Sequence, residues 1–165
     1  MVGREGAVGL LEACGSRISR IDGLIQIDGE AWRAPAELCR QLARSDPDFG
    51  SLVLRHAELQ MAEARRSAFC QAVHKAPQRM ARWLLESLER SGGRNPMPVT
   101  QEFLSAMLGV QRTSVTLHAR VLQRKGAINY SRGSVQVVNV AGLRQASRSC
   151  HAYMKAQRAA LGFEA

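Results

Sequence analysis

The sequence lacks the long hydrophobic runs and the clustered cysteines that mark membrane and secreted proteins. No apolar stretch approaches the roughly 18 residues that a membrane-spanning helix needs. The start, MVGREGAVGL, has one basic residue, an acid beside it and too short an apolar stretch for a secretory signal. The four cysteines, Cys14, Cys39, Cys70 and Cys150, are too scattered for a disulfide-stapled scaffold. We therefore expect a cytoplasmic chain with reduced thiols and no contact with a membrane.

The sequence also lacks the short motifs of common enzyme classes. It contains no P-loop and no nucleophile elbow, and no serine or cysteine has an identifiable base partner. These absences argue against nucleotide hydrolysis and acyl transfer. We expect a protein that is not an enzyme.

Acidic residues are scarce beyond the first third of the chain. Residues 1–50 hold 6 basic and 8 acidic side chains, a net charge of −2, whereas residues 51–165 hold 17 and 6, a net charge of +11. From Phe103 onward there are 9 basic residues and one acid, Glu164. Such a field attracts polyanions, nucleic acid among them. Charge alone is equally compatible with a soluble basic protein that has no specific partner.

The 165 residues fit one mid-sized domain or two small ones, and a 45% hydrophobic content can supply a core. In residues 1–44, short apolar pieces at positions 8–11, 18, 21 and 24–27 alternate with glycines. This alternation predicts two or three short strands, too few to form a stable sheet alone. A short helix should follow from Ala34-Pro35 to about Ala43.

A long helix is predicted in residues 45–74, because Ser45-Asp46-Pro47 supplies a cap and a first-turn proline. Its small and apolar residues recur at steps of 3 and 4, as in a coiled-coil seam: Leu54, Ala57, Met61, Ala64 and Ala68. Small residues allow a second helix to approach closely. We expect this seam to form a homodimer interface, and the alternative is burial against the chain's own sheet.

A helix-turn-helix with a wing is predicted in residues 75–145. Helix 77–90 and a loop precede a short helix, Gln101–Leu108, which Thr100 caps and Gly109 ends. A second helix runs from about Gln111 to Lys125-Gly126. Strands at 127–130 and 135–138, joined by the turn 131–134, form the wing. Residues 146–165 are expected to form a helical tail.

The segment TQEFLSAMLGVQRTSVTLHARVLQRKGAINYSRGSVQVV resembles the C-terminal winged helix of the Crp/Fnr transcription regulators. The preceding FCQAVHKAPQRMARWLLESLER resembles the helix that leads into that domain, and the long helix resembles the family's dimerisation helix. GREGAVGLL is similar to the family's sensor β-roll around its phosphate-binding cassette. The family's sensor usually has a longer N-terminus, and roughly its first half has no counterpart here.

The resemblance implies DNA contacts at specific positions. The family arginine that binds guanine corresponds to Arg112, its cytosine-reading glutamate to Thr113 and its second arginine to Leu117. A guanidinium can bind guanine O6 and N7 with two bonds, whereas Leu117 can only pack or touch a thymine methyl. Thr113 and Leu117 differ from the residues that the family has at these positions, so we do not expect this chain to bind the family's usual DNA half-site. Backbone contacts are expected from six residues: Thr100, Gln101, Gln111, Ser114, Arg120 and, at the wing tip, Arg132.

The predicted fold is α+β: a partial β-roll remnant, a long dimerisation helix and a C-terminal winged helix-turn-helix. The predicted function is a sequence-specific transcription regulator of Crp/Fnr type that binds an inverted-repeat operator in double-stranded DNA as a homodimer. RNA polymerase is a further candidate partner. The alternative is an interaction module that pairs with a full-length relative and does not bind DNA.

Two ligand hypotheses receive less support, and no cofactor or metal is expected. Cys70 and His74 lie four residues apart and Cys150-His151 could complete four metal ligands, but the close cysteine pairs favoured by zinc sites are absent. The cysteine cluster of the family's iron–sulfur members is also absent. In the family's nucleotide-binding members a Gly-Glu pair holds the ribose; here the corresponding residues are Gly6-Ala7, and Arg17 is the candidate phosphate ligand. We therefore expect no response to cyclic AMP.

Overall fold

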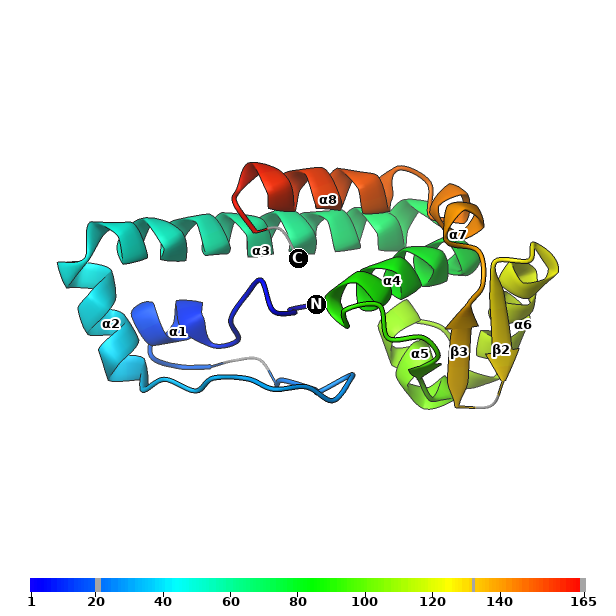
Figure 1. Cartoon of the computed structure of the whole chain (residues 1–165), viewed down its shortest axis with the longest axis horizontal. Coiled ribbons are helices and arrows are strands. Elements are labelled where there is room, and N and C mark those ends of the chain that lie inside the picture. Colours follow the sequence, from blue (N-terminus) through cyan, green and yellow to red (C-terminus); the bar gives the residue numbers. More distant parts are fainter. Residues whose placement is uncertain (20–21, 132, 164–165) are drawn as a thin grey trace.

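The computed structural model describes residues 1–19, 22–131 and 133–163, and it confirms the α+β class. A long helix runs along the molecule, with a small helical and β domain at one end (Figure 1). The elements in chain order are α1 (Leu10–Cys14), α2 (Ala36–Ser45), α3 (Pro47–Val73), α4 (Ala76–Arg90), β1 (Met97–Pro98), α5 (Gln101–Leu108), α6 (Arg112–Arg124), β2 (Ile128–Ser131), β3 (Ser134–Val137), α7 (Val140–Ala146) and α8 (Cys150–Ala160). None of the helices in the described ranges combines the length and the apolar character that crossing a membrane requires.

The N-terminal segment differs from the prediction. Its described residues form helices α1 and α2 joined by irregular chain, which includes residues 24–27, and they contain no strand. The predicted strands at 8–11 and 24–27, and with them the β-roll remnant, are therefore wrong for this part of the chain. Position 21 lies outside the described residues. Leu10, Leu11 and Cys14 have helical spacing, and α1 packs on α2. A strand needs a hydrogen-bonded neighbour, and no described segment lies in position to provide one.

Helix α3 begins where the sequence predicts it. The Asp46 carboxylate accepts hydrogen bonds from the backbone N–H groups of Asp48 (2.9 Å) and Phe49 (3.1 Å), and Pro47 occupies the first helical position. These bonds satisfy two of the amides that have no partner within the helix. The cap therefore fixes both the start of α3 and its sharp turn away from α2.

Removing this cap should lower stability modestly. We expect Asp46→Ala to reduce the free energy of unfolding by about 1 kcal/mol, because two helical amides lose their acceptor. Urea unfolding followed by circular dichroism measures this. Asp28→Ala, which removes an exposed aspartate outside any helix, is the control and should change stability by less than about 0.5 kcal/mol. Equal losses for both variants would contradict the capping role.

The N-terminal residues are held against α3 and α4 by buried polar groups. The backbone N–H of Ala7 donates to Nε2 of the buried His56 (3.3 Å). The guanidinium of Arg90, 5% exposed, donates from Nε to Glu5 (2.7 Å) and from Nη2 to Glu63. A buried charge needs such compensation, because desolvation alone would be costly. This network joins the N-terminal segment, α3 and α4 near the middle of the molecule.

The same network should make stability depend on pH. Burial lowers the pKa of His56 below its ordinary 6.5, against the opposing charges of Glu63 and Glu5. The folded state therefore prefers the neutral ring, and its contribution to stability is lost as the pH falls below about 6.5. The pKa of Glu5 is also lowered, because the hydrogen bond and charge of Arg90 outweigh the opposing effect of burial. Stability should fall further below pH 4.5, where Glu5 becomes protonated more readily in the unfolded chain.

Chemical unfolding at a series of pH values checks this dependence. We expect His56→Gln to reduce the loss of stability between pH 6.5 and 5 and to leave the loss of stability below pH 4.5 unchanged. Glu5→Gln should do the reverse. A wild-type stability that stays constant from pH 7 to 5 would contradict the assignment of His56, and one that stays constant below pH 4.5 would contradict the assignment of Glu5.

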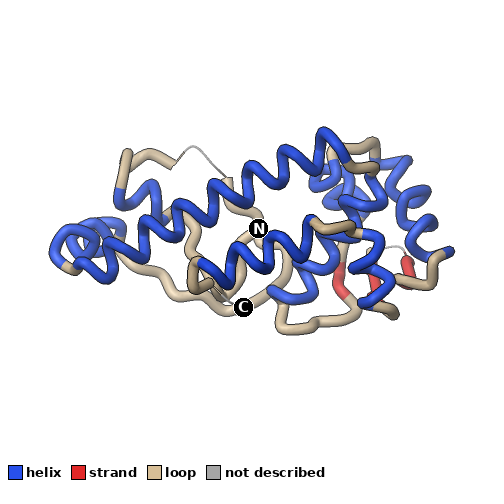
Figure 2. Tube along the Cα trace, turned by 90° about the horizontal axis from the view of Figure 1, so that it is seen from above, coloured by secondary structure: helices blue, strands red, loops and turns tan. Residues whose placement is uncertain are grey.

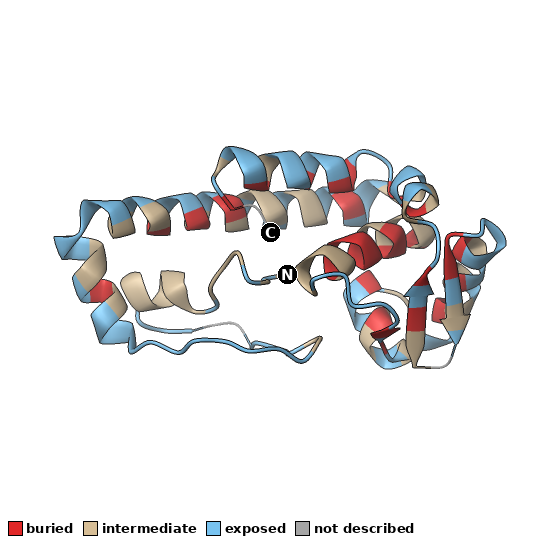
Figure 3. Cartoon of the chain, in the orientation of Figure 1, coloured by how far each residue is buried: buried red, intermediate tan, exposed pale blue. Residues whose placement is uncertain are grey.

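The main hydrophobic core lies in the domain formed by α4 to α7 and the sheet, where buried residues concentrate (Figure 3). Leu84 of α4 is fully buried among residues of the later elements, including Leu104, Val115, Ile128 and Leu143. The strands pair antiparallel in the order β1-β3-β2. Two layers, helices and sheet, therefore enclose one core. A smaller cluster, Leu59, Met154 and Phe163, joins α8 to α3, and the two helices run side by side in both views (Figures 1 and 2).

Candidate nucleic-acid interface

Helix α5 is placed by local bonds that the sequence partly predicts. The Thr100 hydroxyl accepts from the Phe103 N–H (3.1 Å), which confirms the predicted cap. The Gln101 side chain donates to the Thr116 hydroxyl of α6 (2.8 Å). This bond fixes the two helices relative to each other and occupies one of the two amide protons of Gln101.

The turn between α5 and α6 depends on a glycine and on an arginine from α4. Gly109 has φ of 59°, a left-handed conformation that favours glycine, as predicted. Arg79 donates to the Leu108 carbonyl just before this turn (2.6 Å) and to the His74 carbonyl at the end of α3 (3.0 Å). Arg79 therefore links the turn to the long helix. No local sequence signal reveals the bond to Leu108, because Arg79 and Leu108 are 29 positions apart in sequence.

Helix α6 presents a solvent-exposed face opposite the core. Its inward residues are buried as predicted: Val115, Ala119 and Leu122. The opposite face carries exposed residues at steps of 4, 3 and 4: Thr113, Leu117, Arg120 and Arg124. Leu117 is 59% exposed in the middle of this face. A polar, basic face with one apolar residue can contact both base edges and phosphates.

The first turn of α6 places the predicted base-reading arginine in solvent. Arg112 is the first residue of the helix and is exposed; Gln111 before it is also exposed, and Ser114 is half-buried. Residues at the N-terminus of a recognition helix are the ones that approach base edges. Arg120, Gln123 and Arg124 line a surface groove further along the helix.

The wing follows α6 as predicted. Gly126 ends the helix region with φ of 65°, and β2 and β3 pair with Tyr130 opposite Val135. The predicted wing-tip residue, Arg132, lies outside the described residues. Strand β1, which no sequence pattern predicts, pairs with β3 through Met97 and Val135. The Asn95 side chain extends this pairing, since it donates to the Val137 carbonyl (2.8 Å) and accepts from the Val137 N–H (2.9 Å).

The predicted dimer seam lies on the free side of α3. Leu54 is 73% and Met61 53% exposed; Ala64 and Ala68 are exposed and Ala57 is half-buried. Three buried residues of α3 face its own chain: His56, Leu59 and Cys70. Each follows a seam residue (Leu54, Ala57 and Ala68) by two positions. A shift of two residues turns the helix by about 200°. The chain's own sheet therefore does not cover the seam.

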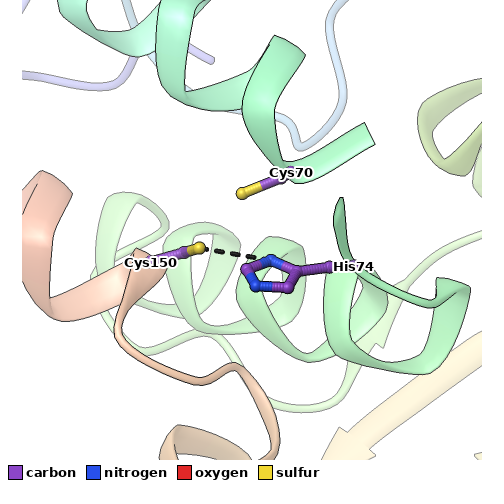
Figure 4. Close-up of side chains that lie close together, drawn as sticks. All are labelled: Cys70, His74 and Cys150. Atoms are coloured by element: carbon purple, nitrogen blue, oxygen red, sulfur yellow. Dashed lines mark hydrogen bonds between the residues drawn. The ribbon is translucent and has the colours of Figure 1, made fainter. Parts of the chain in front are cut away.

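Three of the four residues considered as metal ligands lie together. Cys70 and His74 come from the end of α3 and Cys150 from the start of α8, and their side chains point toward one another (Figure 4). The Sγ of Cys150 is 3.3 Å from Nδ1 of His74. His151 instead contacts Glu89, with Nε2 3.1 Å from the carboxylate.

Residues 78–146 match the family described as the Crp-like helix-turn-helix domain. This part of the chain is similar to the Crp-like helix-turn-helix domain. The predicted resemblance to the Crp/Fnr family is thereby confirmed. No curated protein sequence matches the chain significantly.

Two solved structures from Thermus thermophilus are similar to the chain. TTHA1359, a transcriptional regulator of the CRP/FNR family, is 29% identical with a TM-score of 0.56; the match covers 62% of this chain and 55% of that one. TTHB099, a CRP-family transcriptional regulator, is 20% identical with a TM-score of 0.49, and the match covers 58% and 51%. The chain thus spans little more than half the length of either protein.

Proposed function

We propose that the chain is a sequence-specific transcription regulator that binds double-stranded DNA through α6 of its Crp-like domain. The observation that carries the proposal is the exposed α6 face opposite Val115, Ala119 and Leu122, with Arg112 at its first turn. The similarity to TTHA1359 supports it. Arg112, Thr113 and Leu117 are the proposed base-reading residues. The proposed backbone contacts are Thr100, Gln101, Gln111, Ser114, Arg120 and Arg132.

We further propose that the protein binds DNA as a homodimer through the α3 seam. The support is that one face of α3 packs on the chain itself while the opposite face leaves Leu54 and Met61 exposed. Residues 45–74 would then be the dimerisation helix and residues 75–145 the DNA-binding domain. Two-fold pairing of two recognition helices requires an inverted-repeat site.

Selection of binding sites from random duplexes, followed by anisotropy titrations at several salt concentrations, tests the proposal. We expect an inverted repeat to be enriched. Binding to it should weaken linearly on a log–log plot against salt, with a slope of about −0.9 for each phosphate neutralised. An absence of DNA binding even at low salt would contradict the proposal and favour the interaction-module alternative.

A further inference from the structure

The cluster formed by Cys70, His74 and Cys150 takes no part in the proposed DNA contacts. Cys70 is 1% and Cys150 0% exposed, while His74 is half-buried. Their ligand atoms, two Sγ and one imidazole nitrogen, all lie within 4.8 Å of one another. Two buried thiols facing one imidazole form the donor set that thiophilic divalent ions prefer.

We propose that these three residues bind one Zn²⁺ ion, with the fourth position open to water or another small ligand. Tetrahedral zinc with bonds of about 2.3 Å to sulfur and about 2.0 Å to nitrogen separates sulfur from nitrogen by about 3.5 Å. The distance between Cys150 Sγ and His74 Nδ1 is 3.3 Å. In such a site the two sulfur atoms lie about 3.8 Å apart. All three ligand atoms already lie within 4.8 Å of one another, so the two sulfur atoms need to approach each other by about 1 Å at most.

Local structure brings the ligands together. His74 is the C-cap of α3, and its N–H donates to the Cys70 carbonyl (3.0 Å), so both side chains emerge from the last turn of one helix. Cys150 is the first residue of α8, so its side chain lies at the start of that helix. In the described part of the chain no fourth histidine, cysteine or carboxylate ligand joins the group.

The surroundings of the cluster keep His74 neutral and, without a metal, keep Cys70 protonated. Burial lowers the pKa of His74, and Arg66, Arg148 and Arg82 lower it further, so the ring is neutral and able to coordinate. Burial raises the pKa of the Cys70 thiol to about 11, and its hydrogen bond with Cys150 adds to this. In the absence of metal the Cys70 thiol is therefore protonated. On binding Zn²⁺, both cysteines release their protons to solvent and coordinate as thiolates, which makes the complex with neutral His74 uncharged.

Titration of the reduced, chelator-treated full-length protein with Co²⁺ tests the proposal. Thiolate coordination to Co²⁺ produces sulfur-to-metal charge-transfer absorption in the near ultraviolet. We expect this absorption to saturate at one equivalent of Co²⁺ and to disappear when one equivalent of Zn²⁺ is added. Absence of the charge-transfer band would overturn the proposal.

Variants locate the ion. Cys70→Ser and Cys150→Ser should each weaken binding by at least about 100-fold, beyond the 10- to 100-fold typical of a supporting residue. The control is the double variant Cys14→Ser/Cys39→Ser, which alters a separate cysteine pair in which Cys14 Sγ lies 3.7 Å from the Cys39 carbonyl. It should bind Co²⁺ like the wild type. Binding that is lost only in the control would place the metal elsewhere and refute the assignment.

A second readout covers the case in which a buried Cys→Ser variant fails to fold. His74→Gln removes a half-buried ligand and leaves both cysteines in place. Because both thiols are buried, alkylation requires transient opening of the protein; in the wild type, Zn²⁺ should slow this alkylation of Cys70 and Cys150 in peptide maps, and in His74→Gln the same slowing should require at least about 100-fold more Zn²⁺. Equal protection in both proteins would exclude His74 as a ligand and overturn the three-residue site.

Discussion

Replacing Arg112 with alanine is expected to weaken binding to the cognate duplex by about one to two orders of magnitude and to change binding to a scrambled duplex much less. The guanidinium begins α6 and is exposed, so two hydrogen bonds to O6 and N7 of one guanine are available to it when the helix enters the major groove. Such a contact contributes about 1–3 kcal/mol of discrimination, which corresponds to about 10- to 100-fold in affinity for the cognate site. The preference should become flat at a single G·C pair in each half-site. Anisotropy titrations against both duplexes at several salt concentrations measure the effect.

Arg120→Ala is the matched control for this experiment. Arg120 is exposed on the same helix but two turns further along, where a phosphate contact is proposed. It should weaken cognate and scrambled binding alike and reduce the salt slope by about one unit per subunit. Arg132→Ala should behave in the same way. If Arg112→Ala lost affinity equally for both duplexes, Arg112 would not be the base-reading residue.

Replacing Ala64 with glutamate is expected to convert a dimer into monomers. Ala64 is exposed in the single chain, so the substitution leaves the monomer's own packing intact. In a dimer formed through the seam, the two glutamates would lie close to the two-fold axis as buried, unpaired like charges. A cost of about 3 kcal/mol or more weakens the dimer by at least about 100-fold. Sedimentation equilibrium over a range of protein concentrations measures the dissociation constant directly.

An alanine-to-glutamate substitution on α8 is the control that distinguishes the effect of the seam position from the effect of the added charge. Ala156 is an exposed alanine in the middle of α8, so Ala156→Glu adds an identical charge to an exposed helical position outside the seam. It should leave the dimer unchanged. An Ala64→Glu protein that sediments as the wild type does would mean that the interface lies elsewhere. The monomeric variant should also lose most of its affinity for an inverted repeat, because each half-site is then bound separately.

The elements with strong local signals could be predicted from the sequence, in several cases to within a residue. Asp46-Pro47 defines the start of α3, Thr100 caps α5, and Gly109 supplies the left-handed turn before α6. Each of these signals acts within four residues of the chain, so it does not depend on what the rest of the protein does. The spacing of Val115, Ala119 and Leu122 likewise determined which side of α6 faces the core.

Only the tertiary structure decided the features that depend on distant partners. Alternating apolar residues in the first third predicted strands, but a strand exists only beside another, and the described residues instead form α1 and α2. The sequence placed a seam on α3, and only the packing of α8 and the N-terminal segment on the opposite side showed that the seam is free. Cys150 contacts His74 although the two residues are 76 positions apart in the sequence. Composition and spacing can describe one helix face or one cap, but the approach of two faces depends on the folding of everything between them.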